Sequence, residues 1–269
     1  MIEKCAQIWD EVRVKTPLVH CITNYVTVND VANIILAGGA SPAMVEHPSE
    51  AGDFARIAGA LYLNLGTLTG EQEMAMIEAV KGAAAAAVPL IIDPVACGVV
   101  PRKAAVIEKL LANGKLACIK GNSAEVKSLA GVEAQARGVD SVDQGEGLEE
   151  ACRSLAEKKK IVVAATGPED VVTDGKRVAI VKNGTDLFSS ITGAGCMVGG
   201  VVAACTAAAA GEDWLAAVTG LMAFNIAGER AARLSGDNPG TFRYMLFDHL
   251  YKLRGQDILK EARVDWKSR

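Results

Sequence analysis

Short apolar runs alternate with stretches of helical pattern along most of the chain. Four apolar runs are continuous rather than alternating: Leu61–Leu65, Leu90–Ile92, Leu116–Ile119 and Ile161–Ala165. A continuous run is typical of a strand buried on both faces, as in a parallel sheet covered by helices. Helical patterns lie between the runs, over Glu71–Ala87, Lys103–Ala112, Ser123–Ala130 and Gly147–Lys159. The alternation predicts an α/β fold with a mostly parallel central sheet flanked by helices on both faces.

The pattern changes in the last hundred residues. Asp174-Gly175 separates Val171–Thr173 from Arg177–Val181, which predicts a hairpin. Three helices are expected after it, near Gly195–Ala210, Trp214–Leu234 and Thr241–Leu253. The most loop-like internal stretch is Gly131–Gly147, and no proline- or serine-rich linker or repeat interrupts the sequence. We therefore expect one domain over residues 1–269.

Composition excludes several classes of protein. Half of the 269 residues are hydrophobic and 22% are charged, which is typical of a globular protein. A net charge of −4 provides no global attraction to nucleic acid or anionic membranes. The seven cysteines form no zinc-binding spacing and the N-terminus is not signal-like, so we expect reduced thiols and a cytoplasmic location.

One uncharged stretch, Leu187–Gly211, is long enough to span a bilayer. Its first half contains serine, threonine and glycine, and its second half is mainly alanine. This composition favours a buried core helix over a transmembrane segment. We expect no membrane association.

Polar or glycine-rich residues follow each predicted strand. The strand ends are Asn64-Leu65-Gly66-Thr67, Asp93-Pro94-Val95, Lys120-Gly121-Asn122, Thr166-Gly167 and Thr192-Gly193. In an open α/β sheet, ligands bind at the carboxyl ends of the strands. We therefore expect these residues to line a single crevice.

The segment Ile191-Thr192-Gly193-Ala194-Gly195-Cys196 is a glycine-rich turn that leads into an apolar helix. The first N–H groups of that helix have no partners within it, so they can hold a phosphate. The positive end of the helix dipole is also expected to favour the thiolate of Cys196. The residues alone fit equally well a tight strand-to-helix turn followed by a small buried thiol.

Three charged residues accompany the turn. Asp93 leaves a buried strand, where a carboxylate suits Mg²⁺ beside substrate phosphates or braces the next loop. Asn122 and Glu125 form a capping-box pattern, and Glu125 is also placed to reach a hydrated metal. Lys120 suits a polyphosphate as a point charge, although an isolated lysine is more often a solvated surface residue. The sequence contains neither GxxxxGK[ST] nor GxGxxG, which argues against a P-loop and a dinucleotide fold.

Two segments near the N-terminus suit a small heterocycle. Asn24 follows an apolar strand-like run and offers hydrogen bonds, although loop or cap duties explain it equally well. Met44 follows a turn over residues 38–43, and its soft side chain suits a pocket wall or ordinary core. The three histidines have no metal-ligand spacing, so we interpret them as structural.

Seven motifs in order give the chain a specific likeness over nearly its whole length. They are P-L-V-H-C-I-T-N (17–24), G-A-S-P-A-M (39–44), L-N-L-G-T-L (63–68), I-I-D-P-V (91–95), I-K-G-N-S-A-E (119–125), A-T-G (165–167) and I-T-G-A-G-C (191–196). In these the chain resembles the hydroxyethylthiazole kinases, thiamine-salvage enzymes of the ribokinase-like superfamily. The resemblance implies transfer of the ATP γ-phosphate to the primary alcohol of 4-methyl-5-(2-hydroxyethyl)thiazole, with Mg²⁺.

The resemblance also implies roles for individual residues. Substrate-binding residues would be Met44, Gly193 and Asn24; ATP-binding residues Lys120 and Thr166; metal-supporting residues Asp93 and Glu125; and anion-hole residues Gly193, Ala194 and Gly195. Cys196 stands where the wider superfamily has an aspartate base. Family members are usually homotrimers with active sites at subunit interfaces. Lys120 replaces an arginine found in many relatives, which exchanges a bidentate phosphate grip for a point charge.

Three questions stay open at this stage. Cys196 either removes the proton of the attacking hydroxyl or only occupies space beside it. The substrate is either the thiazole alcohol or a related small alcohol such as hydroxymethylpyrimidine. A non-catalytic nucleotide sensor with the same fold is a further alternative, against which the intact Asp93, Glu125 and glycine-rich turn argue.

Overall fold

The computed structural model describes residues 1–132 and 147–268. In this part of the chain nine strands form one sheet, in the order β2-β1-β3-β4-β5-β6-β7-β8-β9. The strands are β1 (Leu18–Ile22), β2 (Ser41–Ala43), β3 (Ala60–Asn64), β4 (Leu90–Asp93), β5 (Leu116–Asn122), β6 (Val162–Thr166), β7 (Asp170–Thr173), β8 (Arg177–Val181) and β9 (Val264–Ser268).

The sheet is parallel over most of its width. Every neighbouring pair from β2 to β6 is parallel, and the pairs from β6 to β9 are antiparallel. The predicted mostly parallel sheet is therefore confirmed. All residues of β3 and β4 are buried, because helices cover both faces of the sheet.

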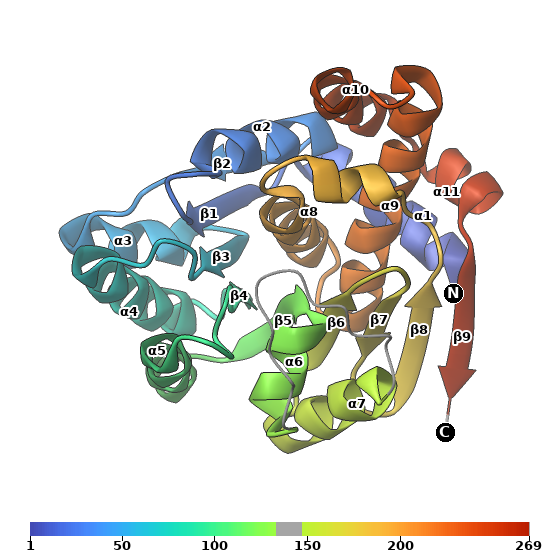
Figure 1. Cartoon of the computed structure of the whole chain (residues 1–269). Helices are drawn as coiled ribbons and strands as arrows, with labels where there is room; N and C mark the ends of the chain where they lie inside the picture. Colours follow the sequence, from blue (N-terminus) through green and yellow to red (C-terminus); the bar gives the residue numbers. More distant parts are fainter. Residues whose placement is uncertain (133–146, 269) are drawn as a thin grey trace.

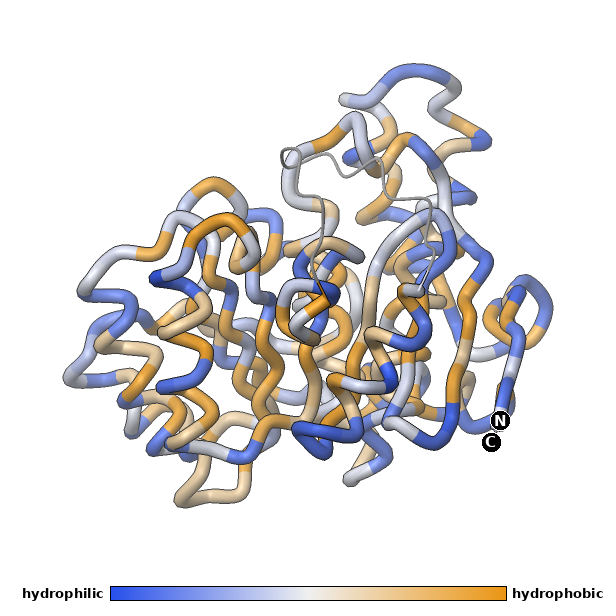
Figure 2. The backbone as a smooth tube through the Cα atoms, turned by 60° about the horizontal axis from the view of Figure 1, so that its bottom comes forward, coloured by the Kyte–Doolittle hydropathy of each residue, from blue (hydrophilic) through white to orange (hydrophobic). Residues whose placement is uncertain are grey.

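Helices form a layer on each side (Figure 1). One layer and its hydrophobic core contain α1 (Ile2–Lys15), α2 (Val28–Gly38), α8 (Ala194–Ala208), α9 (Asp213–Ser235), α10 (Pro239–Lys252) and α11 (Gly255–Glu261). The other layer and core contain α3 (Pro48–Ile57), α4 (Gly70–Ala85), α5 (Pro101–Asn113), α6 (Ser123–Ala130) and α7 (Leu148–Lys159). Figure 2 shows the same organisation as hydrophobic chain at the centre and hydrophilic chain at the periphery.

Most elements of the predicted pattern are confirmed. The hairpin of β7 and β8 turns at Asp174-Gly175, where Gly175 has a φ of 91° and Asp174 Oδ1 accepts a hydrogen bond of 2.7 Å from the Arg177 amide. Helix α6 has the predicted bounds, Ser123–Ala130. Of the loop-like stretch predicted over Gly131–Gly147, residues 133–146 lie outside the described residues.

The prediction of a turn before Met44 is wrong for residues 41–43. Residues 41–43 form β2, an edge strand that pairs with β1 alone. Pro42 lacks an N–H, and an edge strand is where a sheet tolerates that loss. A three-residue strand with a central proline therefore has the composition of a turn.

The order of the strands creates a switch point between β1 and β3. The chain leaves β1 through α2 on one face of the sheet, and it leaves β3 through α4 on the opposite face. Such a reversal opens a crevice at the carboxyl ends of the two strands, where ligands bind in open α/β sheets. Asn24 and Asn64 lie at these two ends.

The uncharged stretch over residues 187–211 is not one helix. It contains most of a 3₁₀ helix (Asp186–Ser190), the glycine-rich turn and the buried helix α8. Among the described helices, none has the length and apolar character needed to cross a bilayer.

Candidate active site

Helix α8 begins at the glycine-rich turn, as predicted. Gly193 precedes the helix with a φ of 83°, a left-handed conformation that favours glycine. A Cβ at this position would lie 2.6 Å from Cγ2 of Thr27. None of the described side chains caps the helix start. The first N–H groups of α8 are thus available to an anion. The space beside them is open because Gly193 has no side chain.

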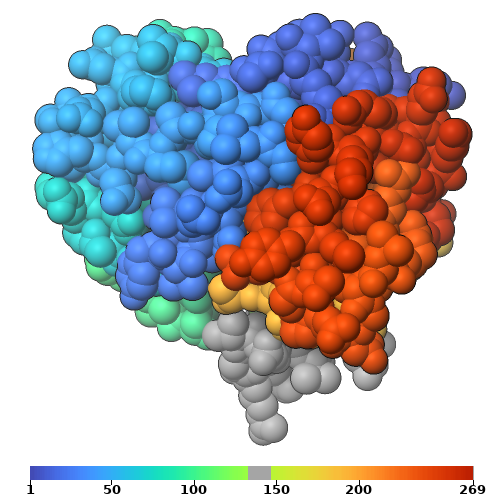
Figure 3. All heavy atoms as spheres, turned by 90° about the horizontal axis from the view of Figure 1, so that it is seen from above, coloured from blue at the N-terminus to red at the C-terminus, as the bar shows by residue number. Residues whose placement is uncertain are grey.

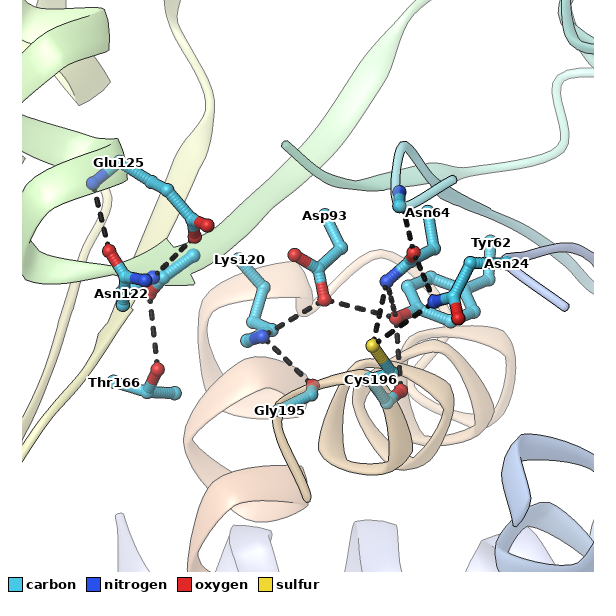
Figure 4. Close-up of polar contacts among 12 residues, drawn as sticks. Asn24, Tyr62, Asn64, Asp93, Lys120, Asn122, Glu125, Thr166, Gly195 and Cys196 are labelled. Carbon is cyan, nitrogen blue, oxygen red and sulfur yellow. Dashed lines mark hydrogen bonds and ion pairs between the residues drawn. The ribbon is translucent and has the colours of Figure 1, made fainter. Parts of the chain in front are cut away.

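The ends of β4 and β5 meet the start of α8 through one lysine (Figure 4). Lys120 Nζ lies 3.0 Å from Oδ2 of Asp93 and 2.8 Å from the carbonyl oxygen of Gly195. Both members of the ion pair are 3% exposed. Burial opposes the charge of Lys120, but the carboxylates of Asp93 and Glu125 outweigh it and raise the pKa of Lys120. The lysine is therefore a fixed, protonated cation beside the first turn of α8.

Tyr62 is a buried residue of the site that sequence reasoning missed. Its hydroxyl lies 2.9 Å from the carbonyl oxygen of Cys196 and 3.2 Å from Oδ2 of Asp93. The same hydroxyl accepts a hydrogen bond of 3.2 Å from the side-chain amide of Asn64. Tyr62 lies inside a continuous apolar run, so nothing in the pattern distinguishes it from ordinary core.

The thiol of Cys196 is held by two asparagines from the switch point. Nδ2 of Asn24 and Nδ2 of Asn64 donate to the sulfur over 3.4 and 3.3 Å. Nδ2 of Asn24 also donates to Oδ1 of Asn64 over 2.9 Å. These contacts bring the carboxyl ends of β1 and β3 together with the first turn of α8.

The expectation of a favoured thiolate is wrong in direction. Burial raises the pKa of Cys196, and the nearby Asp93 carboxylate raises it further. Lys120 and the surrounding hydrogen bonds lower the pKa of the thiol by less. The helix field therefore acts on a group whose charge is already disfavoured by burial and by a neighbouring anion, and the thiol stays neutral near pH 7.

Glu125 performs the capping role that its spacing predicts. Its Oε2 accepts a hydrogen bond of 2.8 Å from the Asn122 amide, while Asn122 Oδ1 accepts one of 2.9 Å from the Glu125 amide. Its Oε1 accepts a further bond of 2.8 Å from the amide of Ala96, a residue with a φ of 60° in the loop after β4. Burial, followed by the charge of Asp93, raises the pKa of Glu125. The carboxylate thus fixes the Asp93 loop as well as its own helix.

A cleft of about 810 Å³ opens beside the helix start. Thr166, Gly193, Ala194 and Gly195 all line it. The hydroxyl of Thr166 donates to the carbonyl oxygen of Gly121 over 3.3 Å. A volume of this size is typical of a site for a small organic ligand.

Met44 lies directly after β2, farther along the carboxyl edge. It is partly buried against the same hydrophobic core as Cys196. The histidines serve the fold: His20 Nε2 lies 2.7 Å from the carbonyl oxygen of Val45, and His47 caps α3. The structural interpretation of these two histidines agrees with the contacts.

The donor set suits a divalent cation bound mainly through phosphates and water. The described residues contain no group of three or more His, Cys, Asp or Glu side chains placed to hold a metal. Asp93 uses Oδ2 for Tyr62 and Lys120, and none of the hydrogen bonds among the described residues uses its Oδ1. Mg²⁺ commonly binds through one or two carboxylates beside substrate phosphates, so Asp93 and Glu125 fit such an ion.

The fold has well-defined relatives among solved structures. A ribokinase-like superfamily protein from Enterococcus faecalis aligns with a TM-score of 0.62 at 11% identity, over 93% of this chain and 95% of that one. At such low identity the likeness shows the fold alone. The chain therefore has a fold of the ribokinase-like class, and Asn64, Asp93 and Lys120 lie at the carboxyl edge of its sheet.

Within that class the chain belongs to the hydroxyethylthiazole kinase family, whose model matches residues 9–256. A hydroxyethylthiazole kinase from Syntrophomonas wolfei is 62% identical over 266 residues, which cover 99% of this chain and 100% of the relative. A solved structure of a hydroxyethylthiazole kinase protein from Pyrococcus horikoshii aligns with a TM-score of 0.89 at 33% identity, over 98% and 99% of the two chains.

Proposed function

We propose that the protein transfers the γ-phosphate of ATP to the primary alcohol of 4-methyl-5-(2-hydroxyethyl)thiazole, as a step of thiamine salvage. The observation that carries this proposal is the joining of Asp93, Lys120 and the start of α8 by hydrogen bonds of 3.0 and 2.8 Å in a member of this family. Phosphoryl transfer requires alignment and charge stabilisation more than covalent chemistry from the protein. The site offers both.

ATP occupies the cleft beside α8 in this proposal. Thr166 contacts the nucleotide, and the amides of Gly193, Ala194 and Gly195 hold the transferring phosphate. Lys120 supplies a positive charge beside the first turn of α8, because its Nζ lies 2.8 Å from the Gly195 carbonyl oxygen. Fixed dipoles and a buried cation stabilise developing charge without reorganisation.

Mg²⁺ would be held by Asp93 and Glu125, together with the phosphates and water. When bound, the ion neutralises charge on the phosphates. Glu125 also holds the loop after β4 through the amide of Ala96 at 2.8 Å, which keeps Asp93 at the end of its strand. The two carboxylates thus have different tasks, with Asp93 nearer to the reacting groups.

The alcohol lies at the switch point, against Asn24, Gly193 and Met44. Cys196 then lies beside the attacking hydroxyl, and the two asparagine amides at 3.4 and 3.3 Å fix the direction of its sulfur. Its raised pKa makes it a neutral contact for the hydroxyl rather than a base. In a loose transition state the hydroxyl proton leaves late, so a strong base is not required.

A homotrimer with active sites at the subunit interfaces is part of the proposal. Directly after Asn24, the side chains of Tyr25 and Val26 are 72% and 53% exposed, and Leu36 of α2 is 54% exposed. Figure 3 shows the side of the molecule on which α2 lies beside α10. Exposed apolar residues next to a site suit burial by a neighbouring subunit. Light scattering should give three times the chain mass, and Tyr25→Glu combined with Val26→Glu should reduce it.

We further propose that the chain is a single domain that works in the cytoplasm. All nine described strands belong to one sheet, which supports the first part. All seven cysteines are free thiols, which suits a reducing compartment and supports the second part.

The test compares two alcohols in the presence of Mg²⁺ and ATP. The kcat/KM of the purified protein for the thiazole alcohol, measured as ATP consumption, should be at least about tenfold higher than that for hydroxymethylpyrimidine. Preference for the pyrimidine would assign the protein to a sister kinase. Binding of ATP without consumption with either alcohol would indicate a nucleotide sensor.

A further inference from the structure

Two backbone turns contribute to the cleft wall. Gly167 follows β6, and Asn183 with Gly184 follows β8. All three residues line the cleft of about 810 Å³. β7 pairs with both β6 and β8, so the sheet brings the two turns to the same edge, and side chains outside the sheet determine how each turn is held there.

Asn225, a buried residue of α9, joins the two turns. Its Nδ2 donates one hydrogen bond of 2.7 Å to Oδ2 of Asp170 and another of 2.9 Å to the carbonyl oxygen of Asn183. Oδ1 of the same Asp170 accepts a bond of 3.0 Å from the amide of Gly167. Both protons of a single side-chain amide are thus used, one for each turn.

Glu229 holds the second turn one helical turn farther along α9. Its Oε1 accepts a hydrogen bond of 2.8 Å from the amide of Gly184. Gly184 has a φ of 148°, in the region that favours glycine. Residues four apart lie on the same face of a helix, so Asn225 and Glu229 present a continuous polar edge to the cleft wall.

We propose that Asn225 is a positioning residue for the nucleotide, which holds the Gly167 and Asn183–Gly184 turns in their conformations and so preserves the shape of the cleft wall. The inference rests on the proposed function only in assigning this cleft to ATP. A wall that is ordered before binding adds no ordering entropy to the binding step. Without the Asn225 amide, the Asp170 carboxylate and the Asn183 carbonyl oxygen each lose a buried donor, so both turns are held by fewer hydrogen bonds.

The alternative is that this network only stabilises the fold. The two roles differ in what they change: a structural role lowers stability, whereas a positioning role selectively weakens nucleotide binding. Thr219 provides a matched control on the same helix. It is buried, its hydroxyl donates 2.7 Å to the Leu215 carbonyl oxygen, and it does not line the cleft.

The experiment measures binding of a non-hydrolysable ATP analogue and steady-state kinetics for wild type, Asn225→Ala and Thr219→Val. Asn225→Ala should weaken analogue binding and raise the KM for ATP by about tenfold or more, with kcat at saturating ATP and the KM for the alcohol near wild type. Thr219→Val should leave all four quantities near wild type. Equal binding by the two variants would overturn the inference.

Asp170→Asn serves as a second variant if Asn225→Ala does not fold. It keeps the volume of the side chain, but its single acceptor oxygen cannot serve both Gly167 and Asn225. The same selective loss of nucleotide binding is expected, and unchanged binding would overturn the inference. If wild type binds the analogue, the variants lose binding as expected and no alcohol is phosphorylated, the inference holds and the proposed function fails. A wild type that does not bind the analogue refutes both.

Discussion

Lys120 Nζ lies 3.0 Å from Oδ2 of Asp93 in a buried ion pair at the carboxyl ends of β5 and β4. The same amino group bonds to the Gly195 carbonyl oxygen at 2.8 Å, so the pair also reaches the first turn of α8. A cation in this position links the carboxylate assigned to the metal with the amides assigned to the phosphate. The relationship explains why two segments a hundred residues apart in the sequence act as one site.

Removing the Asp93 carboxylate should lower both the stability and the activity of the protein. Asp93→Asn leaves the buried Lys120 ammonium without its paired carboxylate, which lowers the free energy of unfolding by about 3–5 kcal/mol. The loss of a charged group at the phosphates should lower kcat by roughly 10²-fold. Urea unfolding and ATP-consumption assays measure the two effects.

A double variant separates the two effects. Asp93→Leu combined with Lys120→Met removes both charges, so the double variant should be more stable than Asp93→Asn but no more active than it. If the double variant were instead less stable than the single one, the ion pair would be a net source of stability and this explanation would be wrong.

The neutral state of Cys196 predicts a particular pH dependence. Because burial and the Asp93 charge raise the pKa of the thiol, kcat should show no inflection from thiolate formation between pH 6 and 9. Cys196→Ala should have the same profile shape and lose less than the roughly 10²-fold that a positioned base contributes. An inflection seen in wild type but absent from Cys196→Ala would show that the thiol acts as the base.

Gly193 should tolerate no side chain, for two separable reasons. Its φ of 83° strains any other residue, and a Cβ would lie 2.6 Å from Cγ2 of Thr27. Gly193→Ala should therefore lower kcat/KM for the alcohol by about tenfold or more. Gly211→Ala is the matched control, because Gly211 has a φ of 94° and no atom within 4 Å of its Cβ position. Equal activities in the two variants would mean that the contact with Thr27 is unimportant.

Asp170 predicts a pH-dependent component of stability. Burial raises the pKa of its carboxyl to about 6 from 3.8, although the Gly167 amide, the Asn225 amide and the charge of Lys120 lower it. Between these values the folded state binds a proton that the unfolded chain releases, so this component of the unfolding free energy decreases as pH rises. The decrease is about 2 kcal/mol from pH 4 to pH 7.

Asp170→Asn lacks that component. From pH 4 to pH 7 its free energy of unfolding, measured in urea, should therefore rise relative to that of wild type by about 2 kcal/mol. Parallel pH curves for the two proteins would contradict the buried position and raised pKa of this carboxyl.

The sequence predicted the strands, the strand ends and the helix cap of the site better than the contacts among its side chains. Continuous apolar runs reveal buried parallel strands, and the polar residues that end them, such as Asp93 and Lys120, are visible as breaks in the pattern. The capping pair Asn122 and Glu125 was likewise predictable, because capping depends on neighbours in the sequence. These features are local.

What the sequence could not predict depends on contacts between distant elements. Tyr62 has the pattern of ordinary core, and only its position opposite Asp93 and Cys196 makes its hydroxyl part of the site. The ionisation of Cys196 was predicted in the wrong direction, since the helix start is a local feature whereas burial and the Asp93 charge are tertiary. The tie between Asp170 and Asn225 spans 55 residues, which no local pattern records.

The most direct test of the central claim is the identity of the product. Wild type and Asp93→Asn are incubated with Mg²⁺, ATP and the thiazole alcohol, and the products are followed by phosphorus NMR and mass spectrometry. Wild type should form the monophosphate ester at the primary alcohol together with one ADP per ester, and Asp93→Asn should form it about 10²-fold more slowly. ADP without the ester, or equal rates in the two proteins, would contradict a phosphoryl transfer centred on Asp93 and the start of α8.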